Sequence, residues 1–557
     1  MSPNFAVRQW YALPAILGLL VAACGPDSSP KTASQTNWLR ACDSDAECGD
    51  LRCLCGACTL VCSAESTCTG LPGASCVPAG NAGAVALCGG NEPDSSGLCL
   101  PLCEPDDCPG TSACVAGVCS PVPEPTVRVA VDTSIRYQTL VGFGASVGYV
   151  QNEIVRHPNQ PALYDTMFAG AGLDILRVKN SYGYTGEDIE STSAIVDAAS
   201  ESLERAPTVL LTSWSPPDSL KVNGSSLCGG NPDTCTLATL PDGNFDYAGL
   251  AEYWRASLDA YAAAGVKPDY IGIQNNPNWV PPASGSNDAC KFLPTEGTTT
   301  VSIDGADVEV TYPGLGEAIE AVVGRLAGLA SIPKIAAPET TGVEVTGDYL
   351  PYLDFSNVDA ISHHMYGTDP TAISLEALEA LRDLGQDYGR PLFQTEMQSD
   401  GFGTAVLMHY ALAVEGATAY LQNDFVASAS ILAENPVSLI TLGAEDFSLE
   451  QPYHVMRHYA LHTDPGWERV DATSDAKDLL VSAWAPADGD ALTVVLVNAG
   501  VVEVDVEIDF GEEALTTSEV TRTVFEGVER SAELGALAPE RVLRVPGRAI
   551  ATVALQR

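Results

Sequence analysis

Apolar, strand-like runs alternate with amphipathic helical stretches from residue 138 to residue 450, and this alternation constrains the fold of the 557-residue chain more than any other feature. Strands that alternate with helices are typical of parallel β/α units. Eight strand-like runs are present, at 140–146, 174–179, 208–214, 270–274, 334–338, 360–366, 392–396 and 419–424. Each run turns polar or aromatic at its C-terminal end, where β/α barrels carry their chemistry. The pattern predicts an α/β fold, a (β/α)8 TIM barrel, over 138–450.

Stretches with helical periodicity separate these runs, and helices are expected over 247–266, 314–331 and 403–417. The first is the clearest, because its apolar residues recur at helical spacing and share one face. That face carries Leu250, Tyr253, Trp254, Leu258 and Tyr261.

Residues 451–557 show a different pattern, and 502–510 follow the two-residue period of β-strands. Acidic residues alternate there with apolar ones, which places one set in water and the other in a core. The apolar set is Val502, Val504, Val506, Ile508 and Phe510. Two further apolar runs flank an Asp488-Gly489 turn, which is a hairpin signal. An antiparallel β-sandwich is therefore predicted beside the barrel, and 121–137 is expected to supply a linker and the first strand of that sandwich, at 126–132.

Fourteen of the 18 cysteines lie between Cys42 and Cys119, in a segment with few large apolar residues. Such a segment needs disulfides to stay folded, so 42–120 is predicted to be a small disulfide-rich module that acts as a spacer or interaction module. The spacing C-x5-C-x4-C begins at Cys42 and again at Cys108, which suggests two degenerate copies of one unit. The connectivity stays open. Zinc is the alternative for the closely spaced Cys53, Cys55, Cys58 and Cys62.

The first 24 residues are typical of an export signal, with Arg8 before an apolar stretch and small residues at 21–23. The stretch is too short for a membrane span. Residues 21–24 also resemble a bacterial lipoprotein box, which implies a signal peptide over 1–23 and a lipid on Cys24; an ordinary secretory peptide is the alternative. Residues 24–41 are predicted to form a flexible tether. The expected location is the bacterial outer membrane or cell surface, with the lipid anchor as the sole membrane contact, or the secreted fraction.

The formal net charge is −45, with the acids spread along the chain. This distribution argues against nucleic acid as a partner, because phosphate backbones require clustered Lys and Arg. Neutral polysaccharides or oligosaccharides remain suitable partners. No phosphate loop, zinc-protease helix or nucleophile elbow is present in the barrel, so no cofactor and no metal is expected.

Several motifs of the barrel resemble, in order and spacing, those of glycoside hydrolase family 30. They are GFGAS (142–146), LRV (176–178), SWSPPDSLKVNG (213–224), IQNNPNW (273–279), HHMYG (363–367) and QTEMQ (394–398). The third is the most specific. The resemblance covers roughly 126–557 and implies a β/α barrel with a side β-sandwich built from both ends of the catalytic region. Members of the family are retaining β-glycosidases, among them glucosylceramidases, endo-β-1,6-glucanases and glucuronoxylan xylanases.

The resemblance implies a role for several residues. Glu396, at the end of the seventh strand-like run, matches the family nucleophile, and Arg177 would hold both the substrate and Glu396. The implied substrate-binding residues are Arg177, Trp214, Asn275, Trp279, His364 and Tyr366. A structural ion pair is the alternative for Arg177, core packing for the two tryptophans, and a purely structural role for His364.

One position departs from the family pattern. The family has Asn-Glu-Pro where this chain has Asn275-Asn276-Pro277, so an amide stands in place of the general acid. Loss of a general acid typically costs about 10²–10⁴-fold in rate. Glu296, flanked by Phe292, Leu293 and Pro294, is the preferred substitute acid, because burial by these neighbours would raise its pKa. An exposed loop glutamate is the alternative, and Asp288 and Glu339 are weaker candidates.

Cys228 and Cys235 are close enough in sequence to pair and to stiffen one wall of the cleft, whereas Cys290 has no obvious partner.

Two functions follow from the observations on the barrel and its motifs. One is a retaining β-glycosidase, endo- or exo-acting, that hydrolyses a polysaccharide such as β-glucan or xylan with Glu396 and a displaced acid. The other is a catalytically impaired surface lipoprotein that binds or senses carbohydrate.

Overall fold

The computed structural model describes residues 38–556 with gaps. The gaps are 40–41, 43, 50, 64–67, 69–70, 72–73, 82–83, 85–87, 89–96, 104–111, 116–117, 122–125, 185–188, 283–286, 304, 368–372, 429–436, 512–516 and 538–541. The predicted signal peptide and Cys24 lie outside the described residues, and of the predicted tether only residues 38 and 39 are described. The chain divides into two compact units, Met1–Pro121 and Val122–Arg557, and each is described by itself.

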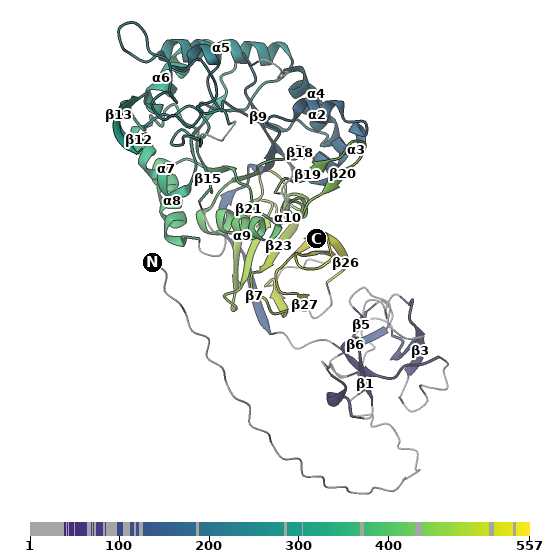
Figure 1. The fold of residues 1–557 in the computed structure, drawn as a ribbon. Helices are drawn as coiled ribbons and strands as arrows, with labels where there is room; N and C mark the ends of the chain where they lie inside the picture. Colours follow the sequence, from purple (N-terminus) through teal and green to yellow (C-terminus); the bar gives the residue numbers. More distant parts are fainter. Residues whose placement is uncertain are drawn as a thin grey trace, which may run out of the picture. The chain divides into compact units, whose positions relative to one another are not determined.

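The second unit contains a closed barrel of eight parallel strands (Figure 1). The strands are β8 (Gly142–Ser146), β9 (Ile175–Lys179), β10 (Thr208–Thr212), β11 (Tyr270–Gly272), β14 (Lys334–Thr340), β15 (Ala360–His364), β16 (Leu392–Glu396) and β17 (Ala419–Gln422). They follow one another around the barrel in chain order, and β17 closes the ring by pairing with β8. Seven lie within the predicted strand-like runs, and β14 extends two residues beyond its run, so the TIM-barrel prediction is confirmed.

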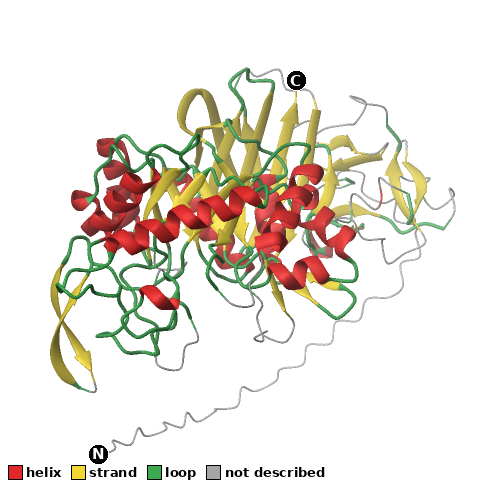
Figure 2. Cartoon of the chain, turned by 90° about the horizontal axis from the view of Figure 1, so that it is seen from above, coloured by secondary structure: helices red, strands yellow, loops and turns green. Residues whose placement is uncertain are grey.

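Helices surround the barrel strands (Figure 2). They are α2 (Gln151–Arg156), α3 (Gln160–Asp165), α4 (Ile189–Ser202), α5 (Tyr247–Ala263), α6 (Leu315–Leu326), α7 (Val343–Tyr349), α8 (Leu375–Tyr388) and α9 (Gly401–His409), with π-helical turns at η4 (Thr166–Gly170) and η7 (Tyr410–Glu415) and 3-10 turns at η5 (Asp218–Leu220) and η6 (Leu350–Tyr352). Helix α5 begins where the Asp246 carboxylate accepts a hydrogen bond from the Gly249 backbone N–H, which caps the first turn. Its predicted apolar face is buried along its whole length.

Two small β-elements extend the loops of the barrel. Strands β12 (Gly297–Ile303) and β13 (Ala306–Tyr312) form a hairpin in the connection that follows β11. Strands β18 (Val426–Ser428), β19 (Ile440–Leu442) and β20 (Phe447–Leu449) form a three-stranded sheet after β17. Helix α10 (Gln451–Ala460) then leads to the side sheet.

The side sheet has the strand order β26-β25-β28-β23-β22-β21-β7-β24-β27. Its bounds are β7 (Val127–Thr139), β21 (Glu468–Ser474), β22 (Leu479–Ala485), β23 (Ala491–Asn498), β24 (Val504–Asp509), β25 (Thr517–Val524), β26 (Ala532–Gly535), β27 (Val542–Val545) and β28 (Ala549–Gln556). In Figure 1 the blue strand β7 lies among green and yellow strands from the C-terminal end. The prediction that this early strand joins the C-terminal sheet is therefore confirmed.

Two details of the side sheet differ from the sequence pattern. Strand β24 pairs with β7 in parallel, so the sheet is mostly, not wholly, antiparallel. The alternation buries Val506, Ile508 and Phe510, but Val502 precedes the strand and is 71% exposed. The two-residue burial pattern thus begins inside β24 and continues to Phe510, one residue past the strand.

The first unit consists of short hairpins joined by loops. After a 3-10 turn, η2 (Asp45–Glu47), come the pairs β1 (Arg52–Leu54) with β2 (Ala57–Thr59), β3 (Ala74–Pro78) with β4 (Gly97–Pro101), and β5 (Ser112–Val115) with β6 (Val118–Pro121). Each hairpin places two cysteines directly opposite each other. These cross-strand partners are Cys53 and Cys58, Cys76 and Cys99, and Cys114 and Cys119. Among the described residues this hairpin occurs three times and is the repeated unit. When the hairpins are aligned by their paired cysteines, Cys53 corresponds to Cys114. The C-x5-C-x4-C spacing had instead aligned Cys53 with Cys119.

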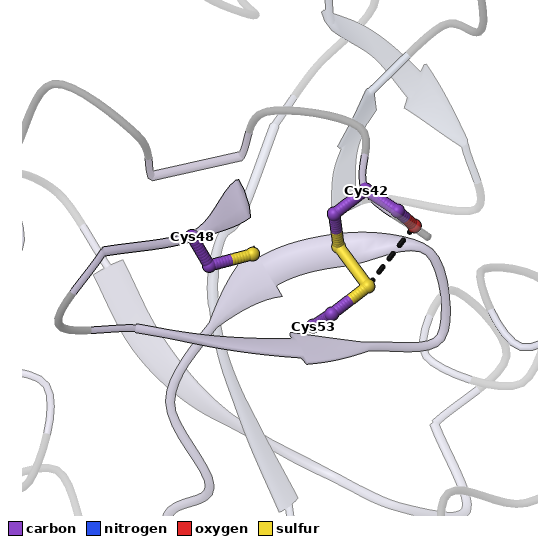
Figure 3. A group of neighbouring side chains, drawn as sticks. All are labelled: Cys42, Cys48 and Cys53. Carbon is purple, nitrogen blue, oxygen red and sulfur yellow. Dashed lines mark hydrogen bonds between the residues drawn. A yellow bond between two sulfur atoms is a disulfide. The ribbon is translucent and has the colours of Figure 1, made fainter. Parts of the chain in front are cut away.

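Disulfides hold this unit together, as predicted. The described bonds are Cys42–Cys53, Cys48–Cys58, Cys55–Cys88, Cys62–Cys76 and Cys68–Cys99. The first two hairpins are thus each bonded to the two cysteines that precede them, and Figure 3 shows Cys42 bonded to Cys53 with the Cys48 sulfur beside the bond. The four cysteines considered for zinc are all in disulfides, so none offers the thiolate that zinc requires. Among the described residues, no helix combines the length and the apolar character that a membrane crossing requires.

Candidate functional site

A cavity of about 610 Å³ lies at the C-terminal ends of the barrel strands. Six neighbouring barrel strands, β10, β11, β14, β15, β16 and β17, each place a residue in the cavity wall, at the strand end or in the loop that follows. In the same order, these residues are Trp214, Asn276, Thr341, Tyr366, Glu396 and Asp424. This is the face where β/α barrels concentrate their polar groups.

Glu396 ends strand β16, lines this cavity and is 4% exposed. Both of its carboxyl oxygens are held: Arg177 Nη1 donates to Oε2 at 2.6 Å, and the Tyr366 hydroxyl donates to Oε1 at 2.9 Å. Burial and the charge of Glu396 raise the pKa of Tyr366 well above its ordinary value, so Tyr366 remains a neutral donor. The carboxylate is therefore fixed in orientation while its edge faces the cavity.

Arg177, on β9, is fully buried and joins three strand ends. Besides Glu396 it donates through Nη2 to Asn275 Oδ1 at 2.7 Å and to Glu339 Oε1 at 3.3 Å. Its guanidinium also lies 4.4 Å from the centre of the Trp214 ring. Burial opposes its charge, but the carboxylates of Glu339 and Glu396 outweigh burial and raise its pKa. The predicted contact between Arg177 and Glu396 is present. Arg177 also forms a buried ion pair with Glu339, which is the structural role expected as the alternative to substrate binding.

Glu339, at the end of β14, lies behind Arg177 and does not reach the cavity surface. Its Oε1 also accepts a hydrogen bond from Thr212 at 3.3 Å. A Cβ at position 272 would collide with its carboxyl group, so Gly272 at the end of β11 is needed for this packing. Burial raises the pKa of Glu339 to about 7, against the opposing effect of Arg177 and with a contribution from Glu396.

Glu339 is expected to make the stability of the protein depend on pH. Its pKa is about 7 in the folded state and 4.5 for an unperturbed glutamate, so the folded state favours the protonated form. The stabilisation is complete below about pH 4.5 and is lost as the pH rises through about 7, with an upper limit of about 3 kcal/mol. Denaturant unfolding of the wild type and of Glu339→Gln, at pH 5 and pH 8, measures this. The wild type should lose more stability between the two pH values than the variant; equal losses would contradict the assignment.

Asn276 occupies the wall of the cavity beside Asn275. Its backbone N–H donates to the Glu339 carbonyl at 3.0 Å, and its φ of 49° is a left-handed conformation that Asn adopts more readily than most residues. Its Oδ1 is buried without a hydrogen-bond partner among the described residues. A side-chain amide cannot transfer a proton at neutral pH, so this position offers polar contact without acid–base chemistry.

A buried ion pair fixes the loop that follows Asn276. Lys179 Nζ, on β9, donates to Asp288 Oδ2 at 2.6 Å, and the Tyr149 hydroxyl donates to the same oxygen at 3.2 Å. The neighbouring Ala289 packs on the Cys228–Cys235 disulfide, which forms as predicted, and Cys290 is buried as a free thiol. One wall of the cleft is thus tied to the barrel by charge and stiffened by a disulfide.

Aromatic side chains border the cavity. Trp214 and Trp279 line it, as does Tyr149, whose ring lies edge-on to Trp214 at 6.2 Å between centroids. Trp214 is nearly buried and packs on Arg177, whereas Trp279 is partly exposed. Flat apolar faces of this kind suit the apolar faces of sugar rings.

His364 is placed differently from the expectation. It is fully buried, does not line the cavity, and neither ring nitrogen has a hydrogen-bond partner among the described residues. Burial, followed by the charge of Arg177, lowers its pKa well below the ordinary value, so it is a neutral packing group. The contact expected of the His-x-Tyr motif is made by Tyr366 alone. The preceding His363 turns away and pairs with Glu415 at 2.7 Å.

Glu296 is also placed differently. It is exposed at the start of the β12–β13 hairpin, accepts a hydrogen bond from the Tyr247 hydroxyl at 3.0 Å, and does not line the cavity. The flanking apolar residues do not bury it: Phe292 turns into the core, while Leu293 and Pro294 are only partly buried. The structure therefore does not bring the preferred substitute acid to the site.

Asp424 is a cavity residue that sequence reasoning missed. It follows β17, is partly buried, and faces the same space as Glu396. Burial raises its pKa to about 7, helped by the charge of Glu396 and opposed by Arg177. The sequence signal was present, because the eighth run ends in Asn423-Asp424 as the seventh ends in Glu396.

No family model matches the sequence, and no curated protein matches it. Solved structures do match. The glycoside hydrolase family 30 subfamily 8 xylanase from Clostridium acetobutylicum is 20% identical with a TM-score of 0.56, and the match covers 77% of this chain and 100% of the xylanase. The catalytic domain of the family 30 xylanase C from Talaromyces cellulolyticus is 16% identical with a TM-score of 0.59, covering 77% and 100%. An endo-β1,6-glucanase is 13% identical with a TM-score of 0.55, covering 78% and 96%. The chain therefore shares the fold of these glycoside hydrolases, a (β/α)8 barrel with a side β-sandwich.

Proposed function

We propose that residues 122–557 form a retaining β-glycosidase that hydrolyses a polysaccharide, with Glu396 as the nucleophile. One observation carries the proposal: Glu396 lines an open cavity, and each of its carboxyl oxygens is held by a separate donor, Arg177 and Tyr366. A nucleophile that is fixed in this way meets the anomeric carbon without reorganising.

The substrate class follows from the walls of the cavity. Its volume of about 610 Å³ is lined by the aromatic side chains Tyr149, Trp214 and Trp279 and by side-chain amides, which suits the alternating apolar faces and hydroxyl edges of a glycan. The net charge of −45 disfavours a strongly acidic polymer. Structural neighbours include xylanases and an endo-β1,6-glucanase, so xylan and β-glucan are the two polymers of choice.

Export belongs to the same proposal. A lipid on Cys24 and the tether that follows it would hold the protein at the bacterial outer membrane or cell surface, where polysaccharide is met. The disulfide-rich unit is consistent with an oxidising compartment, because such bonds persist outside the cytoplasm. In this arrangement the unit serves as a spacer or interaction module.

A second function is favoured by Asn276. With an amide where the family has its proton donor, the cavity can bind a glycan without cleaving it, and every contact of Arg177 and Tyr366 would serve binding equally well. The protein would then be a carbohydrate-binding or sensing lipoprotein.

Hydrolysis assays separate the two functions. The full mature chain is incubated with xylan, β-1,6-glucan and other β-glucans, and with dinitrophenyl β-xylobioside and β-cellobioside, whose leaving group needs little protonation. Release of dinitrophenol with a β-configured sugar as the first product, seen by NMR, supports the retaining glycosidase. Binding of a polysaccharide with no turnover of any substrate would support the sugar-binding protein and overturn the enzyme.

A further inference from the structure

Because position 276 holds an asparagine, the proposed reaction lacks a group that can protonate the leaving oxygen at the position where the family has its general acid. Of the described residues that line the cavity, three carry carboxyl groups: Asp288, Glu396 and Asp424. Glu396 is the proposed nucleophile, so the proton has to come from one of the other two if a carboxylic acid supplies it.

Asp288 is poorly suited to this task. Its Oδ2 accepts from the buried Lys179 ammonium at 2.6 Å and from Tyr149 at 3.2 Å. Two donors to one oxygen, one of them charged, hold the group as an acceptor and tie it to the loop that it fixes.

Asp424, in contrast to Asp288, has few hydrogen-bond donors around its carboxyl group. Among the described residues its carboxyl group receives one side-chain hydrogen bond, from Gln398 Nε2 to Oδ2 at 3.5 Å, which is a weak contact. Its backbone is nonetheless well fixed, since its carbonyl accepts from Leu439 N at 3.1 Å and the next residue, Phe425, donates to Ser146 at 2.7 Å. Asp424 is thus held just after the end of β17, beside the strand that carries Glu396, and none of the described cations forms an ion pair with its carboxyl group.

We infer that Asp424 is the general acid and base of this site, in place of the residue replaced by Asn276. The inference rests on the proposed function. In the first step Glu396 attacks the anomeric carbon, the bond to the leaving oxygen breaks, and that oxygen takes the proton of Asp424. In the second step Asp424 takes a proton from water, the water oxygen attacks the anomeric carbon, and the bond to Glu396 breaks.

The charge coupling between the two carboxyl groups fits this cycle. Burial and the charge of Glu396 bring the pKa of Asp424 to about 7, so a large share of Asp424 is protonated at neutral pH. Once Glu396 is esterified to the sugar its charge is gone, and the pKa of Asp424 falls because the repulsion has been removed. The same group then prefers to lose its proton when a base is needed.

The test compares Asp424→Asn with the wild type on aryl β-glycosides of increasingly poor leaving groups and on the polysaccharide that is cleaved. The variant should lose about 10²–10⁴-fold on poor leaving groups and on polysaccharide. It should form the glycosyl-enzyme almost normally from dinitrophenyl glycosides. Azide, which needs no base, should restore its turnover and give a β-glycosyl azide, while leaving the wild type unaffected. Wild-type activity on poor leaving groups should decline as the pH rises through about 7, and this decline should be absent in the variant.

Three further variants sharpen the result. Glu296→Gln, outside the cavity, is the matched control and should behave as wild type. Asp424→Asn combined with Asn276→Glu should regain activity on poor leaving groups without azide, which a misfolded Asp424 variant cannot do. The inference is overturned if Asp424→Asn slows all substrates equally or none, or if Asp288→Asn shows the leaving-group and azide pattern instead. Wild-type protein that cannot cleave even dinitrophenyl glycosides overturns the proposed function itself.

Discussion

Glu396→Gln is expected to remove hydrolysis of both dinitrophenyl glycosides and polysaccharide, by about 10⁴-fold or more. Glutamine has nearly the same shape but its amide does not attack an anomeric carbon. The amide oxygen can accept from Arg177 while the amide NH2 group donates to the Tyr366 hydroxyl oxygen, so the cavity should keep its form. Initial rates with dinitrophenyl β-glycosides measure the loss directly, because these substrates report on the nucleophile independently of the acid.

Two controls accompany this variant. A 2-deoxy-2-fluoro aryl glycoside should label the wild type, and the labelled peptide should contain Glu396; the variant should stay unlabelled. The affinity of the variant for polysaccharide should remain within a few-fold of wild type. Turnover that persists in Glu396→Gln, or a label on another carboxylate, would show that the nucleophile has been assigned wrongly.

Arg177→Met is expected to lower the free energy of unfolding by about 3–5 kcal/mol at pH 8, the usual cost of removing one partner from a buried ion pair. Arg177 and Glu339 are both 0% exposed and Glu396 is nearly so. The variant leaves two carboxylates without their cation, Glu339 in the fully buried interior and Glu396 in the wall of the cavity. The loss should be smaller at pH 5, where Glu339 carries a proton. Denaturant unfolding at both pH values measures it.

The matched control for Arg177→Met is its combination with Glu339→Gln. Because the second change removes one uncompensated charge, the double variant should be more stable than Arg177→Met at pH 8. Arg177→Lys should also be destabilised, since one ammonium cannot reach Asn275, Glu339 and Glu396 with the separate nitrogens that Arg177 uses. A double variant as unstable as the single one would mean that Arg177 stabilises the fold through packing on Trp214 and not through charge.

The barrel was predictable because its signal is local and repeated. Each strand-like run is mostly apolar, and the buried face of helix α5 repeats at helical spacing. The same reasoning placed β7 in the side sheet, because a strand needs a partner. It failed at Val502, where the alternating pattern extends beyond the paired backbone.

Most of the predicted residues that line the cavity lie at or just after the end of a strand, although His364, also at a strand end, does not line it. Arg177, Glu396 and Tyr366 converge because parallel strands deliver their ends to one face. Glu296 lies in a long connection, and apolar neighbours in sequence do not determine which way such a loop turns. The raised pKa of Asp424 arises from burial and from the charge of Glu396, which is carried by another strand, and sequence spacing does not report this effect.

Strand β7 has a consequence for how the polypeptide is made. It is synthesised before the barrel, yet it lies between β21 and β24, whose residues are more than 300 positions later in the chain. Until the ribosome has passed Asp509, β7 has at least one bare edge that can pair with another chain. Cell-free translation arrested at residue 450 should therefore yield an aggregation-prone, protease-sensitive product even though every barrel strand is present. In the cell, a holdase chaperone that binds the growing chain until the last strands emerge would protect the unpaired edge of β7.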